Sequence, residues 1–221
     1  MPRLIPVIAR VAPEYARCAA WPTAAQGDPW LPLHGSMTPE EVGAAVYSVV
    51  FHGVSGAMDQ ADLPRTPAAA LELLDGFEEF YAPGGLLVHD PGRGVLVEPG
   101  CCCDLFEWRD WLAALDGGPV DLGHDPGPWI EYPGGGAARV WAWGAEDSAG
   151  RPTPVPHVDL SRDALPGLLC DAQRDLAGFL PRLRAWALTL VPDRADHVVA
   201  AFDRGLAIGE PLPAVCGGAA R

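Results

Sequence analysis

The sequence contains no Lys and no Asn, so all 15 of its basic residues are Arg. Lys and Asn codons are rich in A and T, which indicates a GC-rich genome. The 15 Arg stand against 29 acidic residues, giving a net charge of −14. Such a surface repels the phosphate backbone, which excludes general nucleic-acid binding. The charge favours a basic protein partner, although an acidic surface can also serve only to keep a protein dissolved.

Long apolar runs are also absent, so we expect no membrane-spanning segment. Pro and Arg interrupt the first 15 residues, which therefore lack the apolar core of a signal peptide. We accordingly expect a cytoplasmic protein. The six cysteines include no C-x-x-C pair, and three of them are contiguous. This spacing favours reduced thiols over the disulfide framework of a secreted protein.

The motifs of several familiar chemistries are missing as well. There is no Walker loop, no G-x-G-x-x-G after a strand, no G-x-S-x-G and no H-E-x-x-H. No complete catalytic set can therefore be assembled from motifs alone.

The hydrophobic pattern predicts an α+β fold in one domain over residues 38–209. We expect an irregular N-terminal arm over 1–37 and a flexible tail over 210–221. The domain should hold a four- or five-stranded, mainly antiparallel sheet packed by helices, with a helical C-terminal third. The expected helices lie at 38–53, 66–81, 105–115, 161–190 and 193–206, and the expected strands at 86–89, 95–98, 129–132, 139–143 and 155–160.

Two local signals are specific. Thr38, followed by a proline and then by Glu41, has the order of parts of a capping box and predicts a helix start. Pro181 lies inside the long apolar pattern of the C-terminal third. Because proline removes a helix hydrogen bond, we expect a kink there or two separate helices.

The most unusual segment is the cysteine run at 101–103, placed between a strand and a helix. A helix N-terminus lowers the pKa of a nearby thiol, whereas the charge of Asp104 opposes this. Cys103 is the candidate nucleophile, with His89 or His124 as its base. The alternative is that the three cysteines are buried and only pack where the strand ends.

A second segment, Asp121-Leu122-Gly123-His124-Asp125, places two carboxylates and an imidazole within five residues. The candidate metal ligands are Asp121, His124 and Asp125, joined by Cys101 or Cys103. Mixed nitrogen, oxygen and sulfur ligands suit zinc. The alternative is that the segment only sets a turn before a strand. We expect no cofactor as the first choice and zinc as the second.

Trp141 and Trp143 lie two residues apart and so share one face of a strand. If the long C-terminal helix covers that face, both side chains belong to the core. If the face is exposed, they are candidates for partner binding, because Trp often dominates binding energy.

The stretch from Gly84 to Trp129 resembles a group of uncharacterised proteins from high-GC bacteria. The residues that carry this resemblance are Pro99-Gly100-Cys101-Cys102-Cys103, Trp108, Trp111, Leu122-Gly123-His124-Asp125-Pro126 and Trp129. No activity is settled for that group, so the resemblance implies no catalytic residues. The order of helices and hairpins is loosely similar to that of SUKH-type immunity proteins.

Two functions therefore remain open. The preferred hypothesis is an acidic, non-enzymatic protein that binds a basic protein, as an immunity protein or a regulator does. The alternative is a small thiol- or metal-dependent enzyme that uses the cysteine run with His124.

Overall fold

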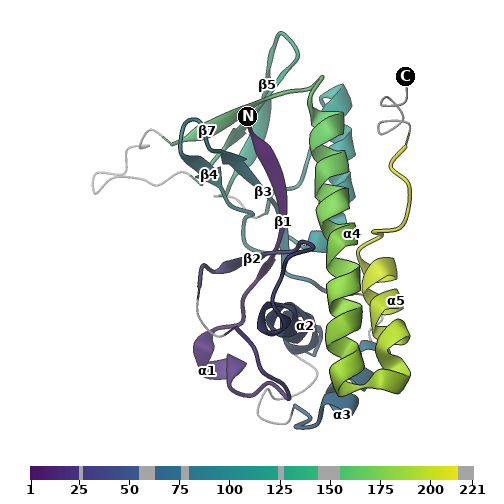
Figure 1. Cartoon of the computed structure of the whole chain (residues 1–221). Helices are drawn as coiled ribbons and strands as arrows, with labels where there is room; N and C mark the ends of the chain where they lie inside the picture. The colour runs from purple at the N-terminus through teal and green to yellow at the C-terminus, as the bar shows by residue number, and fades with distance from the viewer. Residues whose placement is uncertain (25–26, 55–62, 76–79, 124–126, 144–154, 214–221) are drawn as a thin grey trace.

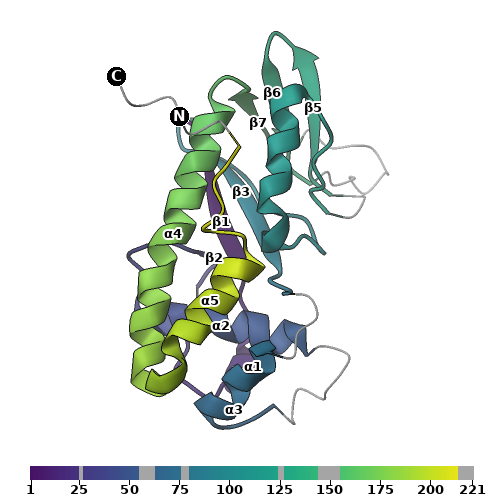
Figure 2. The same ribbon diagram turned by 90° about the vertical axis from the view of Figure 1, so that its right-hand side faces the viewer.

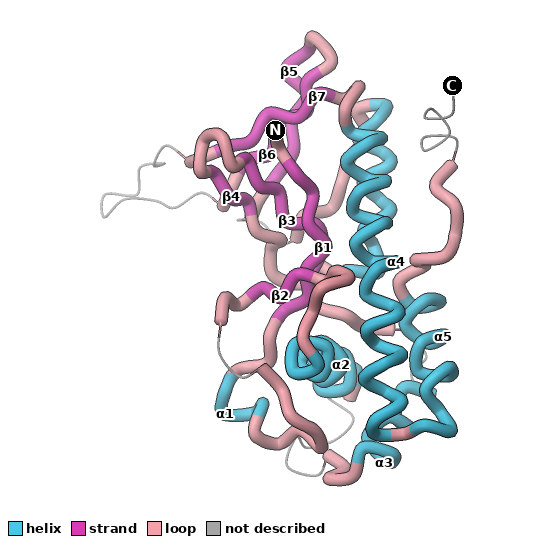
Figure 3. Tube along the Cα trace, in the orientation of Figure 1, coloured by secondary structure: helices cyan, strands magenta, loops and turns pink. Residues whose placement is uncertain are grey.

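The computed structural model describes residues 1–24, 27–54, 63–75, 80–123, 127–143 and 155–213. Two antiparallel sheets lie at one end of the molecule and the helices of residues 13–16, 39–53 and 67–72 at the other, while one long helix runs alongside both (Figures 1 and 3). The predicted α+β fold with mainly antiparallel strands is confirmed. Its strands are divided between a four-stranded and a three-stranded sheet.

The larger sheet has the strand order β2-β1-β3-β4. Its strands are β2 (Trp30–Pro32), β1 (Arg3–Ala9), β3 (Gly84–Asp90) and β4 (Val95–Val97). The expectation that residues 1–37 are irregular is therefore wrong for β1 and β2. β1 pairs with β2 on one side and with β3 on the other, so the start of the sequence lies inside the sheet.

Pro6 explains why β1 was missed, because proline is rarely found in a central strand. Leu33 N donates to Pro6 O (2.9 Å), so the main-chain atoms of Pro6 are directed toward the β2 side. This bond is where the pairing of β1 with the β2 segment ends, because Pro6 has no N–H to donate back to Leu33 O. The missing N–H of Pro6 therefore removes no bond between β1 and β3.

The smaller sheet is β5-β6-β7, a meander of β5 (Trp129–Gly134), β6 (Ala137–Trp141) and β7 (His157–Ser161). Its two predicted hairpin strands and the short third strand are confirmed. The inward side chains of this sheet are buried: Ala138, Val140, Val158 and Leu160. They join the same core as the larger sheet.

Helix α2 (Pro39–Gly53) begins as its sequence predicts. Glu41 N donates to Thr38 Oγ1 (3.2 Å), while Thr38 N donates to the Glu41 carboxylate (2.8 Å). Farther along the helix, the buried Ser48 hydroxyl donates to Ala9 O (2.7 Å) and joins α2 to the end of β1. The second predicted helix is present as α3 (Pro67–Glu72), extended by a short 3-10 turn, η2 (Leu73–Asp75). The expectation that it reaches residue 81 is wrong, because residues 80 and 81 are not helical.

Helix α4 (Leu165–Leu190) is continuous through Pro181, so the expectation of two helices there is wrong. Pro181 and Ala177, whose carbonyl loses its helix partner, are both exposed, so water can satisfy that carbonyl. α4 packs against β1, α2 and α5 (Ala195–Gly205), which follows the short turn η4 (Pro192–Arg194). Figure 2 shows α4 and α5 side by side.

The two sheets contact each other through β4 and β7. In the chain they are connected by η3 (Leu105–Asp116), a 3-10 helix. It packs against β1, β3 and α4, as predicted for the helix in this region. Its side chains Trp108 and Trp111 are buried in the core, and Trp108 Nε1 donates to Leu206 O (2.7 Å). A four-residue helix, α1 (Pro13–Ala16), lies between β1 and β2 in the chain.

Within the described ranges, no helix is both long enough and apolar enough to cross a lipid bilayer. Cys18, Cys101, Cys102 and Cys103 are free thiols. Cys170 is disulfide-bonded, so the expectation that all thiols are reduced is wrong for this residue.

Candidate functional site

The cysteine run forms a tight loop between β4 and η3. Gly100 N donates to Leu122 O (2.9 Å), and Gly84 N donates to Cys103 O (3.0 Å). Cys102 has a left-handed backbone with φ of 65°, which turns the loop outward. Cys101 and Cys102 are exposed and Cys103 is half-buried. The expectation that all three are mostly buried is wrong, because the sharp turn directs the first two away from the core.

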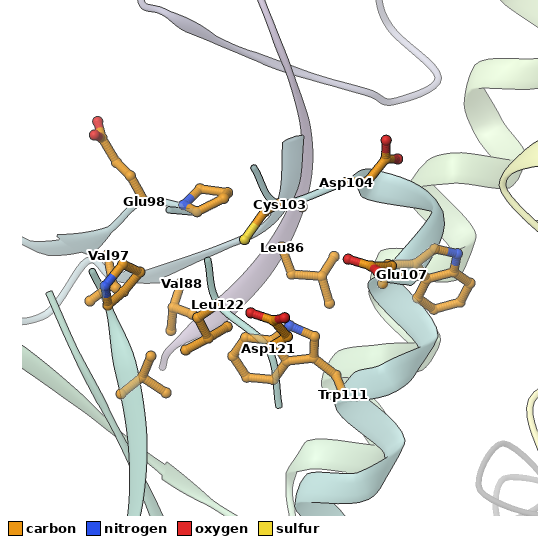
Figure 4. Close-up of a pocket in the computed structure, with 15 residues that line it drawn as sticks. Leu86, Val88, Val97, Glu98, Cys103, Asp104, Glu107, Trp111, Asp121 and Leu122 are labelled. Carbon is orange, nitrogen blue, oxygen red and sulfur yellow. The ribbon is translucent and has the colours of Figure 1, made fainter. Parts of the chain in front are cut away.

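Cys103 lines a small cavity of about 20 Å³, which has room for about one water molecule. Figure 4 shows the Cys103 thiol and the carboxylates of Glu107 and Asp121 turned toward the same space. The apolar lining includes Leu86, Val88, Val97, Trp108, Trp111, Leu122 and Val140. Glu98 and Asp104 also line the cavity, so the site combines one thiol and several carboxylates with apolar side chains.

This environment holds Cys103 in its protonated form. The pKa of the Cys103 thiol is raised to about 11, mainly by burial and in smaller part by the charges of Asp121, Glu107 and Cys101, although a backbone hydrogen bond at Gly100 lowers it. The thiolate, not the thiol, is the nucleophile. The local charges therefore oppose a nucleophilic role at neutral pH.

The structure does not bring His89 to Cys103. Cys103 bonds Gly84 at the first residue of β3, whereas His89 lies five residues farther along that strand. Five residues of strand span roughly 17 Å, well beyond hydrogen-bond reach. His124 and Asp125 lie outside the described residues.

Asp121 is exposed, and its Oδ1 accepts a hydrogen bond from Gly123 N (2.9 Å), which sets a turn. Its carboxylate and that of Glu107 interact with the Cys103 thiol, so the structure does bring Asp121 and Cys103 together. Within the described residues, no group of three His, Cys, Asp or Glu side chains is placed to hold a metal ion. The zinc hypothesis thus has no described ligand set.

Asp104 has a local structural role. Its two carboxylate oxygens accept hydrogen bonds from Ala82 N (2.7 Å) and Phe106 N (2.9 Å), so it caps η3 and fixes that helix to the start of β3. The pKa of this carboxyl is raised to about 6, mainly by burial and in smaller part by the Glu107 charge, although the two hydrogen bonds lower it.

The smaller sheet carries a row of aromatic side chains on its outer face. Trp129, Trp141 and His157 are directly opposite one another across β5, β6 and β7. The Trp129 and Trp141 rings are stacked, with centroids 5.6 Å apart and planes at 12°, and the His157 ring lies 4.5 Å from Trp141. Trp129 is 42% exposed. Trp143, just beyond β6, is 63% exposed, so the open alternative for this face is the one observed.

A row of charges lies beside the aromatic row. Arg139 bonds Asp159 on β7 (2.7 Å) and contacts Glu131 on β5 (3.5 Å). Its guanidinium carbon also lies 5.6 Å from the Trp141 ring. We use the name outer face for the seven residues Trp129, Trp141, Trp143, His157, Glu131, Arg139 and Asp159. Sequence analysis missed all of it except Trp141 and Trp143, because only the strand register shows which residues lie opposite one another.

Comparisons with protein-family models, with curated proteins and with solved structures found no match. The resemblances to the high-GC bacterial group and to SUKH-type proteins stay predictions.

Proposed function

We propose that this chain is a non-enzymatic binding protein that docks a basic protein partner on the outer face of the β5-β6-β7 sheet. The observation that carries the proposal is the stack of the exposed Trp129 on the half-buried Trp141, with the exposed Trp143 beside it. Tryptophan is the residue type most enriched at the energetic centre of protein interfaces. Two exposed tryptophans beside a third, half-buried one form an unusual apolar surface, and such surfaces mark interaction sites.

The outer face is also ordered before any partner arrives. Asp159 and Glu131 hold Arg139 from both neighbouring strands, and Arg139 in turn lies against Trp141. Side chains that are already fixed lose less entropy on binding. The ion pairs therefore support a rigid platform, and we assign them that role instead of direct partner recognition.

The partner's charge follows from the protein as a whole. A net charge of −14 gives an attractive field for a basic protein, which accelerates association. The protonated state of Cys103 lends no support to the thiol-enzyme alternative.

The test is capture of a partner from a lysate of the organism that encodes the chain, at low and high salt. Surface charges are screened over about 8 Å at physiological ionic strength, so high salt should release a basic partner. Trp143→Ala and Trp129→Ala should each weaken binding of the purified partner by about 30-fold. Leu188→Ala is the matched control, because Leu188 is 41% exposed on α4. A partner that binds both Trp variants as tightly as the wild type would overturn the proposal.

A further inference from the structure

The directions of the main-chain groups in the smaller sheet follow from its hydrogen bonds. Ala142 N donates to Pro156 O (2.9 Å), and Arg162 N donates to Gly136 O (2.8 Å). Residues 136 and 142 therefore direct their main-chain groups toward β7. In an antiparallel ladder, successive residues alternate between the two neighbouring strands. The odd-numbered residues of β6 must therefore bond to β5.

This alternation leaves Ile130 with outward main-chain groups. Trp141 pairs with Trp129 and Arg139 pairs with Glu131, so these two β5 residues direct their N–H and C=O groups toward β6. Ile130, between them, directs its N–H and C=O away from the sheet. β5 is an edge strand, and no described residue bonds to these groups of Ile130. An unpaired strand edge is a template for another strand.

An open groove of about 620 Å³ lies along this edge, between β5 and the connector 117–123 that follows η3. Figure 2 shows β5 at the outer edge of its sheet. Tyr132 closes one end, because its hydroxyl donates to Gly118 O (2.6 Å). The other described lining residues are Gly117, Pro119, Val120, Asp121, Leu122, Gly123, Gly127, Pro128, Trp129 and Ile130.

The connector side of the groove carries one carboxylate, and two more lie near it on η3. Asp121 lines the groove. Burial is the largest cause of the raised pKa of Glu107, and the negative charges of Asp110 and Asp121 contribute to it as well. None of the three carboxylates forms an ion pair within the described part of the chain. Arg109, the basic residue of η3, donates instead to carbonyls of the C-terminal segment. A basic side chain in the groove would relieve this repulsion.

We propose that the groove binds an extended, basic segment of the partner as an additional strand on β5. Main-chain bonds to Ile130 would supply the pairing, as in other complexes formed by strand addition. The proposal rests on the proposed function and specifies where and in what conformation part of the partner binds.

The two faces of β5 specify the side chains of that segment. Trp129 and Glu131 lie on the outer face, and Ile130 lies on the inner one, because successive strand residues alternate. Side chains of an added strand would alternate in the same way. Basic residues would then lie beside the Trp129 ring and the Glu131 carboxylate, and small apolar residues beside Ile130.

The probe is a short, labelled synthetic peptide in which Arg and Val alternate, with a Glu and Val peptide as its counterpart. In the full-length protein, the basic peptide should slow hydrogen exchange of the Ile130 amide. Ile130→Pro removes that N–H without removing a bond to β6, whereas Ile130→Ala keeps it. The Pro variant should bind the peptide about tenfold more weakly than the Ala variant.

Asp121→Asn keeps the oxygen that accepts the turn hydrogen bond and removes the charge, so it should also lower the affinity for the basic peptide. Asp28→Asn, at an exposed and remote site, should leave that affinity unchanged. If the acidic peptide binds as tightly as the basic one, the proposal that the segment is basic is wrong. If the basic peptide does not bind, or binds without protecting the Ile130 amide from exchange, the proposal that a strand is added to β5 in the groove is wrong. In either case the outer face could still bind the native partner. The proposed function is therefore tested separately, and it is overturned if the Trp129→Ala and Trp143→Ala variants bind that partner as tightly as the wild type does.

Discussion

The reactivity of Cys103 gives a quantitative test of the site's electrostatics. Its ordinary pKa is 9.0, and burial with nearby negative charge raises it to about 11. At pH 7 the thiolate fraction is therefore on the order of 10⁻⁴, against about 10⁻² for the unperturbed thiol. Alkylation, which proceeds through the thiolate, should be about a hundredfold slower for this reason alone.

The assay uses a variant in which Cys18, Cys101 and Cys102 are replaced by Ser. The rate of iodoacetamide reaction at Cys103, followed by peptide mass, should rise about tenfold per pH unit from pH 7 to pH 10 without a plateau. Because burial is the largest cause of the raised pKa, Asp121→Asn should move the profile only modestly toward lower pH. The matched control is Asp28→Asn, which should leave the profile unchanged.

A plateau in that profile below pH 8 would refute the reasoning. It would mean that Cys103 is a thiolate near neutral pH and that a cationic group outside the described residues stabilises it. The thiol-dependent alternative would then regain its support. An unchanged profile in Asp121→Asn would show instead that the Asp121 charge does not contribute to the raised pKa.

The remaining predictions concern stability, measured as the free energy of unfolding in urea. Thr38→Ala removes the capping box of α2 and should cost about 1 kcal/mol. Gly43→Ala should cost about 1–3 kcal/mol, because its Cβ would lie 2.4 Å from Pro22 O, whereas Gly167→Ala, with open space around it, should not destabilise α4. Asp104→Ala leaves two backbone donors without their acceptor and should cost about 2–4 kcal/mol. Because the folded-state pKa of Asp104 lies above its ordinary value, its protonation stabilises the fold below about pH 4. This contribution should disappear as the pH rises through 6, so the deficit of Asp104→Ala should shrink over that range, and a constant deficit would contradict the raised pKa.

Local signals in the sequence were sufficient where the structure depends on neighbouring residues. The capping box at Thr38 and the glycine-rich turn at 134–136 both act over a few residues, so the helix and hairpin they predict are present. β1 was missed because its pattern contains Pro6. Its place in the sheet depends on where a distant strand, β2, ends.

The candidate site shows the same division. Trp141 and Trp143 could be assigned to one strand face from their spacing, but their exposure depends on which layer covers the sheet. The stack with Trp129 and the position of His157 require the register of three strands. The exposure of Cys101 and Cys102 depends on a left-handed residue, which a cysteine seldom adopts and a sequence pattern does not reveal.

The pairing of β1 has a consequence for the order in which the protein folds. Val7 pairs with Gly85, which lies 78 residues later, and α4 packs on β1 from beyond residue 165. During synthesis, β1 therefore leaves the ribosome well before either partner exists. Closing so long a loop costs conformational entropy before the contact between the strands can stabilise the chain, and this slows folding. Until residue 85 is synthesised, β1 can pair only with the short strand β2, and its other edge stays open to non-native pairing.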